Sequence, residues 1–343
     1  MTTDTEQQLV ESIARLPRIP LASVRPTPLE HLKRLSESLS GPPIYIKRDD
    51  LTGLAIGGNK TRMFEFSLAD ALSKGADTIV AGSAVQSNYC RQLAAACAKL
   101  GLELHLVLRP VRAADKMDQQ GNNLLQRLLG AHVSIIEEFD HASQKHAIEQ
   151  KIEKLKKEGK SVYWPRQEDT VDLDAIAYAE SALEIYQQCR TLNISPSCIY
   201  MAALDTTQAG IELGLAHLNS EIKVRGFCPL NNVPHRHDDI ASMANNGAKR
   251  LGLNVEIKPD QISNDDGYVG ERYGIPTAAG LAAIRTVART EGILLDPVYT
   301  SKAMAALFEH IKTGEVDHDK PIIFLHTGGS PALFAYAEDV LYG

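Results

Sequence analysis

The sequence lacks the signatures of several common classes of enzyme and binding protein. Its 343 residues contain no H-E-x-x-H, no G-x-x-x-x-G-K-[ST] and no G-x-G-x-x-G, the motifs of zinc peptidases, P-loop enzymes and dinucleotide-binding enzymes. It also has no internal repeat and no low-complexity tract. We therefore expect neither a zinc enzyme nor a nucleotide enzyme, and we expect no metal.

The sequence has no excess of basic residues and no long apolar run. Its 36 Lys and Arg are outnumbered by 43 Asp and Glu, which gives a net charge of −7 and a pI near 5.9. This excludes the basic footprint of a protein that binds nucleic acid or an anionic membrane. No segment approaches the roughly 18 apolar residues of a membrane span. The start, MTTDTEQQLVESIARLP, contains acidic residues and does not resemble a secretory signal.

Cysteines are few and show no pairing pattern. The five residues Cys90, Cys97, Cys189, Cys198 and Cys228 are odd in number and form no C-x-x-C pair. This fits packed thiols in a reducing, cytoplasmic environment and argues against a disulfide framework. With 44% hydrophobic and 23% charged residues, the composition is that of an ordinary globular protein with a sizeable core.

Short apolar stretches alternate with helical patterns along most of the chain, which predicts an α/β fold with parallel sheets covered by helices on both faces. The predicted strands are 77–84, 103–108, 132–137, 161–164, 197–203, 222–228 and 321–326. The predicted helices between them include 88–100, which Gly101 ends, 122–130, 147–159 and 207–218. In such folds, ligands bind outside the carboxyl ends of the strands.

Three predicted strand ends carry hydroxyl, amide or glycine residues just before a helix. They are Ser87–Asn88, Thr206–Thr207 and the segment 326–330, HTGGS. Unpaired N–H groups and the helix dipole favour an anion at such positions. Each residue taken alone is equally well explained as a helix cap. Together they indicate a site for a ligand with several anionic groups.

Lys60 follows two glycines in GGNKTRMFEF and begins a predicted helix. The positive end of a helix dipole disfavours an ammonium group and should lower the pKa of this lysine. A neutral amine is what covalent chemistry with a carbonyl requires. Gly57 and Gly58 would let the backbone approach a flat ring. The alternative is a surface lysine after a glycine turn.

Four long segments resemble the family of D-cysteine desulfhydrases and 1-aminocyclopropane-1-carboxylate (ACC) deaminases, which are pyridoxal-phosphate (PLP) enzymes. They are IYIKRDDLTGLAIGGNKTRMFEF, GSAVQSNYCRQLAAACAKLGLELHLVL, YGIPTAAGLAAIRTVARTEGILLDPVYTSKAM and FLHTGGSPALFAY. The resemblance runs from about Thr27 to Tyr336. It implies the tryptophan-synthase β-like fold (fold-type II), with two doubly wound parallel-sheet domains. Residues 1–60 and 171–343 would form the large PLP domain and 61–170 the small one. It also implies a homodimer.

The resemblance implies roles for particular residues. Lys60 would bind PLP covalently and move the α-proton, and Asn59 beside it would also bind the cofactor. Ser87, Asn88 and Tyr89 would contact the substrate. Ser87 would have a catalytic role, by binding the substrate carboxylate or relaying a proton, and Asn88 would also bond to the ring hydroxyl of PLP. The phosphate would be held by Thr206, Thr207, Gln208, Ala209 and Gly210. Tyr273 and Tyr299 would act on the substrate from opposite sides, and Thr300 or Thr327 would approach the pyridine nitrogen.

Three departures from the family pattern leave the substrate open. Asp205 stands where a glycine usually precedes the phosphate-binding residues, and we expect its carboxylate to point away from the phosphate. The segment 166–178, RQEDTVDLDAIAY, replaces a glycine-serine loop. Tyr89 replaces a glutamine or histidine beside the presumed carboxylate site, so the family resemblance does not define the shape of the substrate pocket in this protein.

The sequence therefore predicts a PLP-dependent lyase that acts on a small amino acid by α,β-elimination. A D-cysteine desulfhydrase-like reaction would release pyruvate, ammonia and sulfide. The alternatives are an ACC deaminase, another PLP reaction such as β-replacement, racemisation or cysteate sulfo-lysis, and a non-catalytic family member. Since Thr300 replaces a glutamate of ACC deaminases, we expect negligible ACC turnover.

Overall fold

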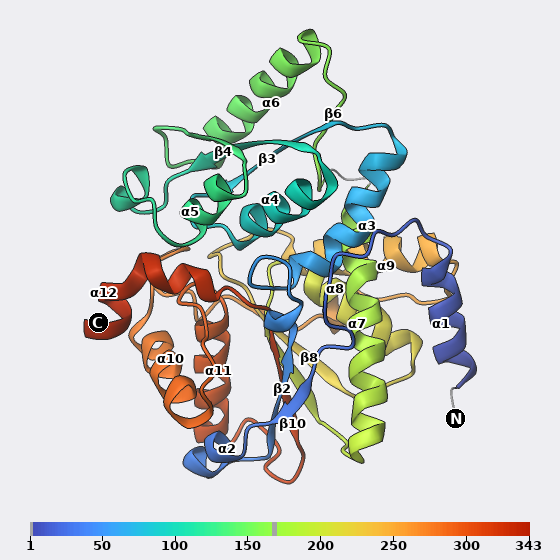
Figure 1. Cartoon of the computed structure of the whole chain (residues 1–343). Coiled ribbons are helices and arrows are strands. Elements are labelled where there is room, and N and C mark those ends of the chain that lie inside the picture. Colours follow the sequence, from blue (N-terminus) through green and yellow to red (C-terminus); the bar gives the residue numbers. More distant parts are fainter. Residues whose placement is uncertain (1–2, 167–169) are drawn as a thin grey trace.

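Two β-sheets form among residues 3–166 and 170–343, which are the residues described by this computed structural model (Figure 1). The larger sheet contains β1 (Leu29–His31), β2 (Ile44–Arg48), β7 (Cys198–Ala202), β8 (Lys223–Phe227), β9 (Asn264–Asp265) and β10 (Ile322–His326). The smaller sheet contains β3 (Thr78–Ala84), β4 (Glu103–Arg109), β5 (His132–Ile135) and β6 (Val162–Tyr163).

Helices cover both faces of each sheet. In chain order they are α1 (Asp4–Ala14), α2 (Lys33–Leu39), α3 (Lys60–Ser73), α4 (Asn88–Leu100), α5 (Gly121–Leu128), α6 (His141–Lys157), α7 (Val171–Leu192), α8 (Thr206–His217), α9 (Arg236–Leu251), α10 (Ala278–Glu291), α11 (Thr300–Thr313) and α12 (Ala337–Tyr342). Short 3-10 helices are η1 (Asp49–Leu51), η2 (Ala113–Lys116), η3 (Pro259–Gln261) and η4 (Ser330–Tyr336). None of the helices that these residues form combines the length and the apolar character needed to cross a membrane.

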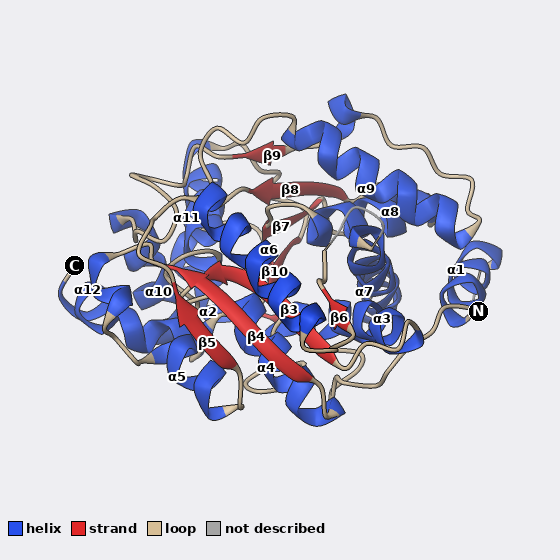
Figure 2. Ribbon diagram, turned by 90° about the horizontal axis from the view of Figure 1, so that it is seen from above, coloured by secondary structure: helices blue, strands red, loops and turns tan. Residues whose placement is uncertain are grey.

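The larger sheet has the strand order β1-β2-β10-β7-β8-β9, and the smaller one β5-β4-β3-β6. Only the edge pair β1 and β2 is antiparallel among the strands described. In the view from above, the smaller sheet lies in front of the larger one, with α6 over its outer face (Figure 2). The parallel direction brings the carboxyl ends of the central strands to one edge of each sheet, where a ligand can meet loops from several strands.

Alternating side chains of the central strands fill the core on both sides of the larger sheet. Met201 of β7 and Leu325 of β10 pack against α7, α8 and α9. Their neighbours Tyr200 and Phe324 point to the opposite face, against α10 and α11. This two-residue period explains why both strands read as continuous apolar runs. The smaller sheet is packed by α3 and α4 on one face and by α6 on the other.

The predicted α/β class with parallel sheets is confirmed, and the predicted strands and helices are present with ends shifted by a few residues. One interpretation is wrong: most of the segment 166–178 is not a loop. Helix α7 begins at Val171, and its residues Leu173 and Ile176 are buried in the core of the larger sheet. The segment contains no glycine, so nothing in it favours a turn over a helix. Residues 167–169 lie outside the described part of the chain.

The strands of the smaller sheet all lie between residues 78 and 163, and those of the larger sheet lie outside this range. The division into a large domain, 1–60 and 171–343, and a small domain, 61–170, stays a prediction.

A buried ionic network fixes the start of α3 against the larger sheet. The Arg62 guanidinium donates to Asp49 at 2.9 Å and to Glu184 of α7 at 2.7 Å. Lys47 Nζ donates to the same Glu184 at 2.7 Å, and Tyr178 Oη donates to Asp49 at 2.6 Å. Burial acts to raise the pKa of Asp49, but Arg62 and Lys47 outweigh it and lower the pKa to about 2. The network therefore depends on every partner being present.

Replacing Arg62 with methionine should lower the free energy of unfolding by about 3–5 kcal/mol, because it leaves Asp49 charged, buried and short of partners. Because the folded pKa of Asp49 is below its unfolded value, its stabilisation is present above about pH 4 and is lost as the pH falls toward 2. In urea titrations, the variant should therefore have a lower free energy of unfolding than the wild type at neutral pH. Its free energy of unfolding should also fall less between pH 4 and pH 2. Lys154→Met, which removes an exposed pair at 3.9 Å with Glu158, is the control. Equal effects of the two substitutions would contradict this prediction.

Candidate active site

A cavity of about 300 Å³ lies at the carboxyl ends of the central strands of both sheets. Its lining includes most of the residues that the sequence singled out. From the smaller sheet and its flanks come Ser87, Asn88 and Tyr89, and from the rest of the chain come Asn59, Lys60, Thr206, Thr207, Tyr273, Tyr299 and Thr327. Residues more than 250 positions apart in sequence, such as Asn59 and Thr327, thus line one cavity. Gln208, Ala209, Gly210 and Thr300 are absent from the lining among the described residues.

Lys60 is the first residue of α3 and its side chain lines the cavity. Burial, and then the nearby Arg166 guanidinium, lower the pKa of the Lys60 amine to about 8, against the opposing charges of Asp205, Asp174 and Asp296. Such an amine is largely neutral in mildly alkaline solution, whereas an ordinary lysine stays charged. The group is therefore suited to attack a carbonyl or to accept a proton.

The two glycines before Lys60 are required by the protein itself. Gly57 and Gly58 have φ values of +69° and +129°, which lie in the range that favours glycine. A Cβ atom on Gly57 would lie 2.0 Å from the carbonyl oxygen of Asp50, and one on Gly58 would lie 2.5 Å from Gln92 Nε2. Close packing thus accounts for both glycines, and their approach to a flat ring stays a prediction.

Hydrogen bonds join three turns of the cavity lining around Asn59. Its Nδ2 donates to Thr207 Oγ1 at 3.0 Å, and its backbone N–H donates to the Thr327 carbonyl at 3.0 Å. The turn after β10, the start of α8 and the start of α3 are therefore held in one arrangement. Because Lys60 follows Asn59, these bonds also set the position of its amine.

The start of α8 carries an acidic cap. Asp205 precedes the helix, and its Oδ1 accepts a hydrogen bond from the Thr206 N–H at 2.5 Å. Its Oδ2 is paired with the Arg166 guanidinium. Burial acts to raise the pKa of Asp205, but Arg166 and the Thr206 N–H hold it below its ordinary value. The carboxylate thus lies at the helix start, where Arg166 supplies the charge that makes this position favourable, and its direction relative to a bound phosphate stays a prediction.

Gln208 and Gly210 both serve the packing of α8. Gln208 Nε2 donates to the Ser263 carbonyl at 2.9 Å, and its Oε1 accepts from Asn264 at 2.7 Å. A Cβ atom on Gly210 would lie 2.0 Å from the carbonyl oxygen of Ala175, so this glycine lets α8 approach α7 closely. Any contact of residues 208–210 with a ligand would therefore come from their backbone.

The start of α4 presents a serine and an asparagine to the cavity. Ser87 caps the helix, since its Oγ accepts from the Cys90 N–H at 3.2 Å. Asn88 lines the cavity, and its Oδ1 accepts from Asn122 Nδ2 at 2.8 Å, while no hydrogen bond of its Nδ2 group is seen among the described residues. Tyr89 lies beside them, and its buried hydroxyl has no hydrogen-bond partner among the described residues. This end of the cavity therefore offers donors that the protein leaves open.

Two tyrosine hydroxyls meet in the wall of the cavity, so the expectation that they face a ligand from opposite sides is wrong. Tyr273 Oη and Tyr299 Oη are 2.5 Å apart, and both side chains line the cavity. Burial raises the pKa of Tyr299 well above its ordinary value and also raises that of Tyr273. Both groups are thus protonated at neutral pH. One O–H donates to the other oxygen, and the second O–H is left for a ligand.

The two candidate threonines differ in position. Thr300 is fully buried, and its Oγ1 both donates to Asp296 Oδ1 at 2.7 Å and accepts from the Asp296 N–H at 2.8 Å. These bonds tie the Thr300 hydroxyl to Asp296 at the first position of α11, and Thr300 does not line the cavity. Thr327 lines the cavity directly after β10. The geometry favours Thr327 for contact with a ligand.

Sequence reasoning missed Arg109, His141, Arg166 and Asp174. The first three line the cavity. Burial raises the pKa of Asp174 to about 7, and this carboxyl interacts electrostatically with Arg166 and with Lys60. Arg109 had a visible signal, since an arginine directly after the apolar strand ELHLVL lies at a strand's carboxyl end. Asp174 had none, because its segment was interpreted as a loop.

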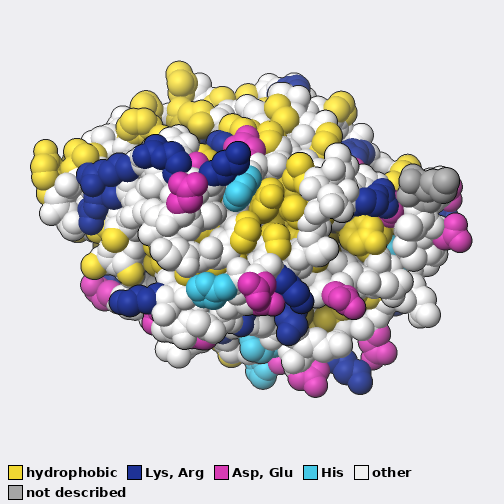
Figure 3. Space-filling view, turned by 90° about the horizontal axis from the view of Figure 1, so that it is seen from below, with side chains coloured by type: hydrophobic (Ala, Val, Ile, Leu, Met, Phe, Trp, Pro, Cys, Tyr) yellow, Lys and Arg dark blue, Asp and Glu magenta, His cyan; other side chains and the backbone are white. Residues whose placement is uncertain are grey.

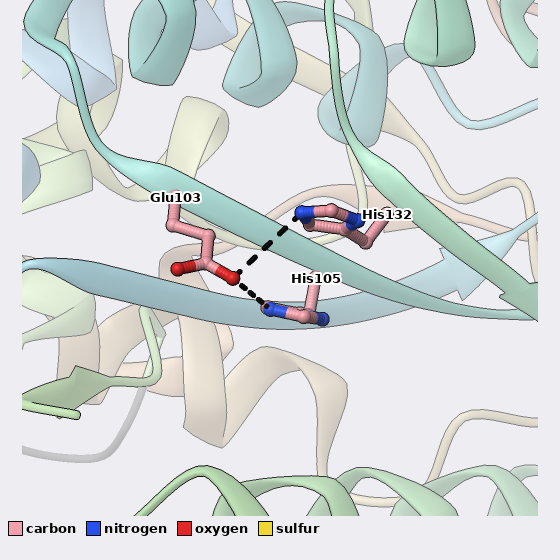
Figure 4. A group of neighbouring side chains, drawn as sticks. All are labelled: Glu103, His105 and His132. Carbon is pink, nitrogen blue, oxygen red and sulfur yellow. Dashed lines mark hydrogen bonds and ion pairs between the residues drawn. The ribbon is translucent and has the colours of Figure 1, made fainter. Parts of the chain in front are cut away.

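Two other features lie away from this cavity. A larger hollow of about 790 Å³ is at the opposite edge of the larger sheet, at the amino ends of β7 and β8, on a face where basic, acidic and apolar side chains are interspersed (Figure 3). On two neighbouring strands of the smaller sheet, Glu103 Oε1 is 2.8 Å from His105 Nε2 and 3.7 Å from His132 Nε2 (Figure 4). Lys160 Nζ lies 2.6 Å from the other Glu103 oxygen and already balances its charge.

Comparison with known proteins gives a consistent set of relatives. The sequence model of a family described as "Pyridoxal-phosphate dependent enzyme" matches residues 21–328. D-cysteine desulfhydrase of Salmonella typhi is 40% identical over 331 residues, which cover 96% of this chain and 98% of that protein. The D-cysteine desulfhydrase of Salmonella choleraesuis (strain SC-B67) matches with the same identity and coverage.

Solved structures are similar over nearly the whole chain. The crystal structure of an ACC deaminase homologue has a TM-score of 0.87 and 34% identity, and the match covers 97% of this chain and 98% of that one. Escherichia coli diaminopropionate ammonia lyase in its apo form has a TM-score of 0.65 and 15% identity, over 99% of this chain and 91% of the other. At that identity, the second likeness concerns the fold alone.

Proposed function

The chain belongs to the family of pyridoxal-phosphate dependent enzymes, and we propose that it is a lyase that removes the β-substituent of a small amino acid, with D-cysteine as the leading substrate. The observation that carries the proposal is the Lys60 amine, whose pKa is lowered to about 8 within a cavity that residues of both sheets line. The 40% identity to D-cysteine desulfhydrase over almost the full length supports elimination as the reaction.

The fold-type II architecture and the cofactor, PLP, are those that the sequence predicted. The cavity fits PLP because a reactive amine, an open amide donor and a helix start with two hydroxyls face the same space. Lys60 would hold the aldehyde carbon, Asn88 Nδ2 the ring hydroxyl, and Thr206, Thr207 and the α8 backbone the phosphate. When bound, PLP supplies an electron sink for the bonding pair left at the α-carbon.

The protein's own residues would perform the remaining steps. The N–H groups at the start of α4, with Ser87 Oγ, would bind the α-carboxylate of the substrate, which orients the α-proton. The Lys60 amine would take that proton, since a pKa near 8 matches the working pH of a general base. The Tyr273–Tyr299 pair would donate a proton to the departing group.

Thr327 favours elimination over ACC deamination. We infer that its hydroxyl, and not that of Thr300, contacts the pyridine nitrogen. A hydroxyl gives a neutral hydrogen bond, whereas a carboxylate favours a protonated, stronger electron sink. Opening a cyclopropane, which has no good leaving group, needs the stronger sink, so the geometry supports a β-substituted substrate.

The test of this function is a screen of the purified holoenzyme for 2-oxoacid release. Both enantiomers of cysteine, serine, β-chloroalanine and diaminopropionate, together with ACC, form the panel. Pyruvate from cysteine or β-chloroalanine is expected, and ACC should give negligible 2-oxobutyrate. ACC turnover with a kcat/KM comparable to that of the best β-substituted amino acid would overturn the proposal.

Removing the acidic cap should not weaken cofactor binding. In Asp205→Gly, the Thr206 N–H and the Arg166 guanidinium become free for the phosphate, so the Kd of PLP for the apoprotein should be equal or smaller. In Arg166→Met, the Asp205 carboxylate faces the phosphate uncompensated, which should weaken binding by about 1 kcal/mol, roughly fivefold. The double variant should recover the affinity of Asp205→Gly. Tighter binding by Arg166→Met alone would contradict this account of the pair.

The proposal also includes the oligomeric state, the cellular location and the domain boundaries of the protein. A homodimer and the division into domains at residues 60/61 and 170/171 are expected from the family resemblance, and a cytoplasmic location is expected from the scattered, unpaired cysteines. Size-exclusion chromatography with light scattering tests the first of these directly.

A further inference from the structure

Arg109 is the last residue of β4, and its side chain reaches the active-site cavity from the smaller sheet. It is only 8% exposed. A guanidinium carries five N–H groups, and two of them have partners here: the Phe139 carbonyl oxygen at 3.4 Å and His141 Nε2 at 2.9 Å. The Nε atom is buried with no hydrogen-bond partner among the described residues. The guanidinium thus keeps open donors at the edge of the substrate space.

No carboxylate of the described residues forms an ion pair with Arg109 within 4.0 Å. The acidic group that interacts with it electrostatically, Asp140, is already engaged, since its carboxylate accepts the Ser143 N–H at 2.8 Å and caps α6. Burial, and then Arg109 itself, lower the pKa of His141, so this histidine is neutral at pH 7 and brings no negative charge. A buried, unpaired cation is unfavourable unless a ligand supplies the counter-ion.

A second hollow, of about 430 Å³, adjoins the cavity and shares Arg109, His141, Leu230 and Tyr273 with it. Its lining also includes Arg272, and none of its described lining residues is acidic. Arg109 therefore stands where the outer hollow meets the cavity. The Arg109 Cζ atom is 6.0 Å from the centre of the Tyr273 ring, so the cation lies on the same wall as the tyrosine pair.

We propose that Arg109 binds an oxyanion on the β-carbon of the substrate, so that amino acids with a β-phosphate or β-sulfonate group are substrates of the same site beside D-cysteine. The inference rests on the proposed function, in which the start of α4 holds the α-carboxylate and leaves Arg109 for a second anion. A planar guanidinium with two adjacent donors suits such a group better than chloride or a thiol.

The chemistry balances as an ordinary elimination. The α-proton passes to Lys60, and the bond from the β-carbon to oxygen or sulfur breaks with its electron pair going to the departing group. Phosphate leaves from the phosphate ester, and sulfite leaves from the sulfonate. Water added to the remaining three-carbon fragment then gives pyruvate and ammonium.

The experiment compares Arg109→Met and Arg109→Lys with wild-type holoenzyme, and Arg127→Met serves as the control because Arg127 is exposed on α5 and bonds to Asn123 at 3.1 Å. The substrates are both enantiomers of O-phosphoserine, cysteate and β-chloroalanine. Arg109→Met should lower kcat/KM for the two anionic substrates by about 10²-fold and change that for β-chloroalanine by less than about threefold. The kcat/KM of Arg109→Lys for the anionic substrates should lie between those of the wild type and Arg109→Met, because lysine keeps the positive charge but lacks the two adjacent N–H donors of the guanidinium.

A binding measurement separates this inference from the proposed function. The Kd of aspartate, whose β-carboxylate cannot leave, is measured by calorimetry on each holoenzyme and should rise about 10²-fold in Arg109→Met but stay unchanged for alanine. Equal losses for aspartate and alanine would assign Arg109 to the α-carboxylate and overturn the inference. If β-chloroalanine is turned over while Arg109→Met leaves the anionic substrates and aspartate unaffected, the inference fails and the lyase stands. If no substrate is turned over, the lyase fails, and the aspartate titration still decides the role of Arg109.

Discussion

Replacing Lys60 with alanine or methionine should abolish covalent attachment of PLP and lower kcat/KM by at least about 10⁴-fold. The amine lies at the start of α3, in the cavity, and it is the group proposed both to hold the cofactor and to move the α-proton. Losing two roles at one atom explains why the effect should exceed that of any other substitution in the site. Non-covalent binding of PLP at the start of α8 should persist.

Borohydride reduction followed by peptide mass spectrometry measures the attachment. In the wild-type protein, the cofactor should be fixed to the peptide that contains Lys60. The matched control is Lys302→Met, because Lys302 is also buried, with a pKa lowered to about 8, yet it donates to the Val269 carbonyl and does not line the cavity. Cofactor fixed to any other lysine of the wild-type protein would show that the assignment is wrong.

The same amine predicts a pH dependence. Only neutral Lys60 can attack the aldehyde, and its pKa is lowered from the ordinary value of 10.5 to about 8. The neutral fraction therefore increases with pH and approaches its limit above pH 8 to 9. The rate at which apoprotein binds PLP covalently, followed by absorbance, should rise through this range and then level. A rate that keeps rising to pH 10 or beyond would mean that the cavity does not perturb this amine.

The sequence was sufficient for the fold because the apolar patterns and the local structure agree. The run from Asp77 to Gly101 contains a strand, a capped turn and a helix with a left-handed glycine end, and the structure has the same sequence of elements. It was insufficient at α7, where the resemblance suggested a loop and the residues themselves favour a helix. Local helix propensity and the burial of Leu173 and Ile176 decided that segment.

Much of the candidate site could be placed from sequence because its residues lie at strand ends, where an α/β fold brings ligands. Partnerships between distant residues could not be read in this way. That Asp205 is balanced by Arg166, 39 positions earlier, depends on how two loops meet. In the sequence, Thr300 and Thr327 are likewise equivalent candidates for contact with the pyridine nitrogen. The structure distinguishes them, because the Thr300 hydroxyl is bonded to Asp296.

Phenylalanine at Tyr273 or at Tyr299 should lower kcat for cysteine by about 10²-fold and leave cofactor binding unchanged. The two hydroxyls share one short hydrogen bond, so each positions the proton of the other. Because the pair acts as a unit, the double variant should lose little more than either single one. The control is Tyr200→Phe. In the wild type, the buried Tyr200 hydroxyl contacts His310 Nδ1 at 2.9 Å in the core of the larger sheet, and Tyr200 does not line the cavity.

The identity of the departing group gives the sharper test of the tyrosine pair. A proton donated to that group matters most when the group is a strong base and least when it is chloride. The loss on Tyr299→Phe should therefore be large for cysteine and serine and small for β-chloroalanine, although all three have the same α-proton. If the loss were equal for all substrates, the pair would be acting at the α-carbon or on the carboxylate. If neither single variant changed the kinetics, the two tyrosines would have a packing role. A loss that grows with the basicity of the departing group is the outcome that places the proton on Tyr299 Oη or Tyr273 Oη.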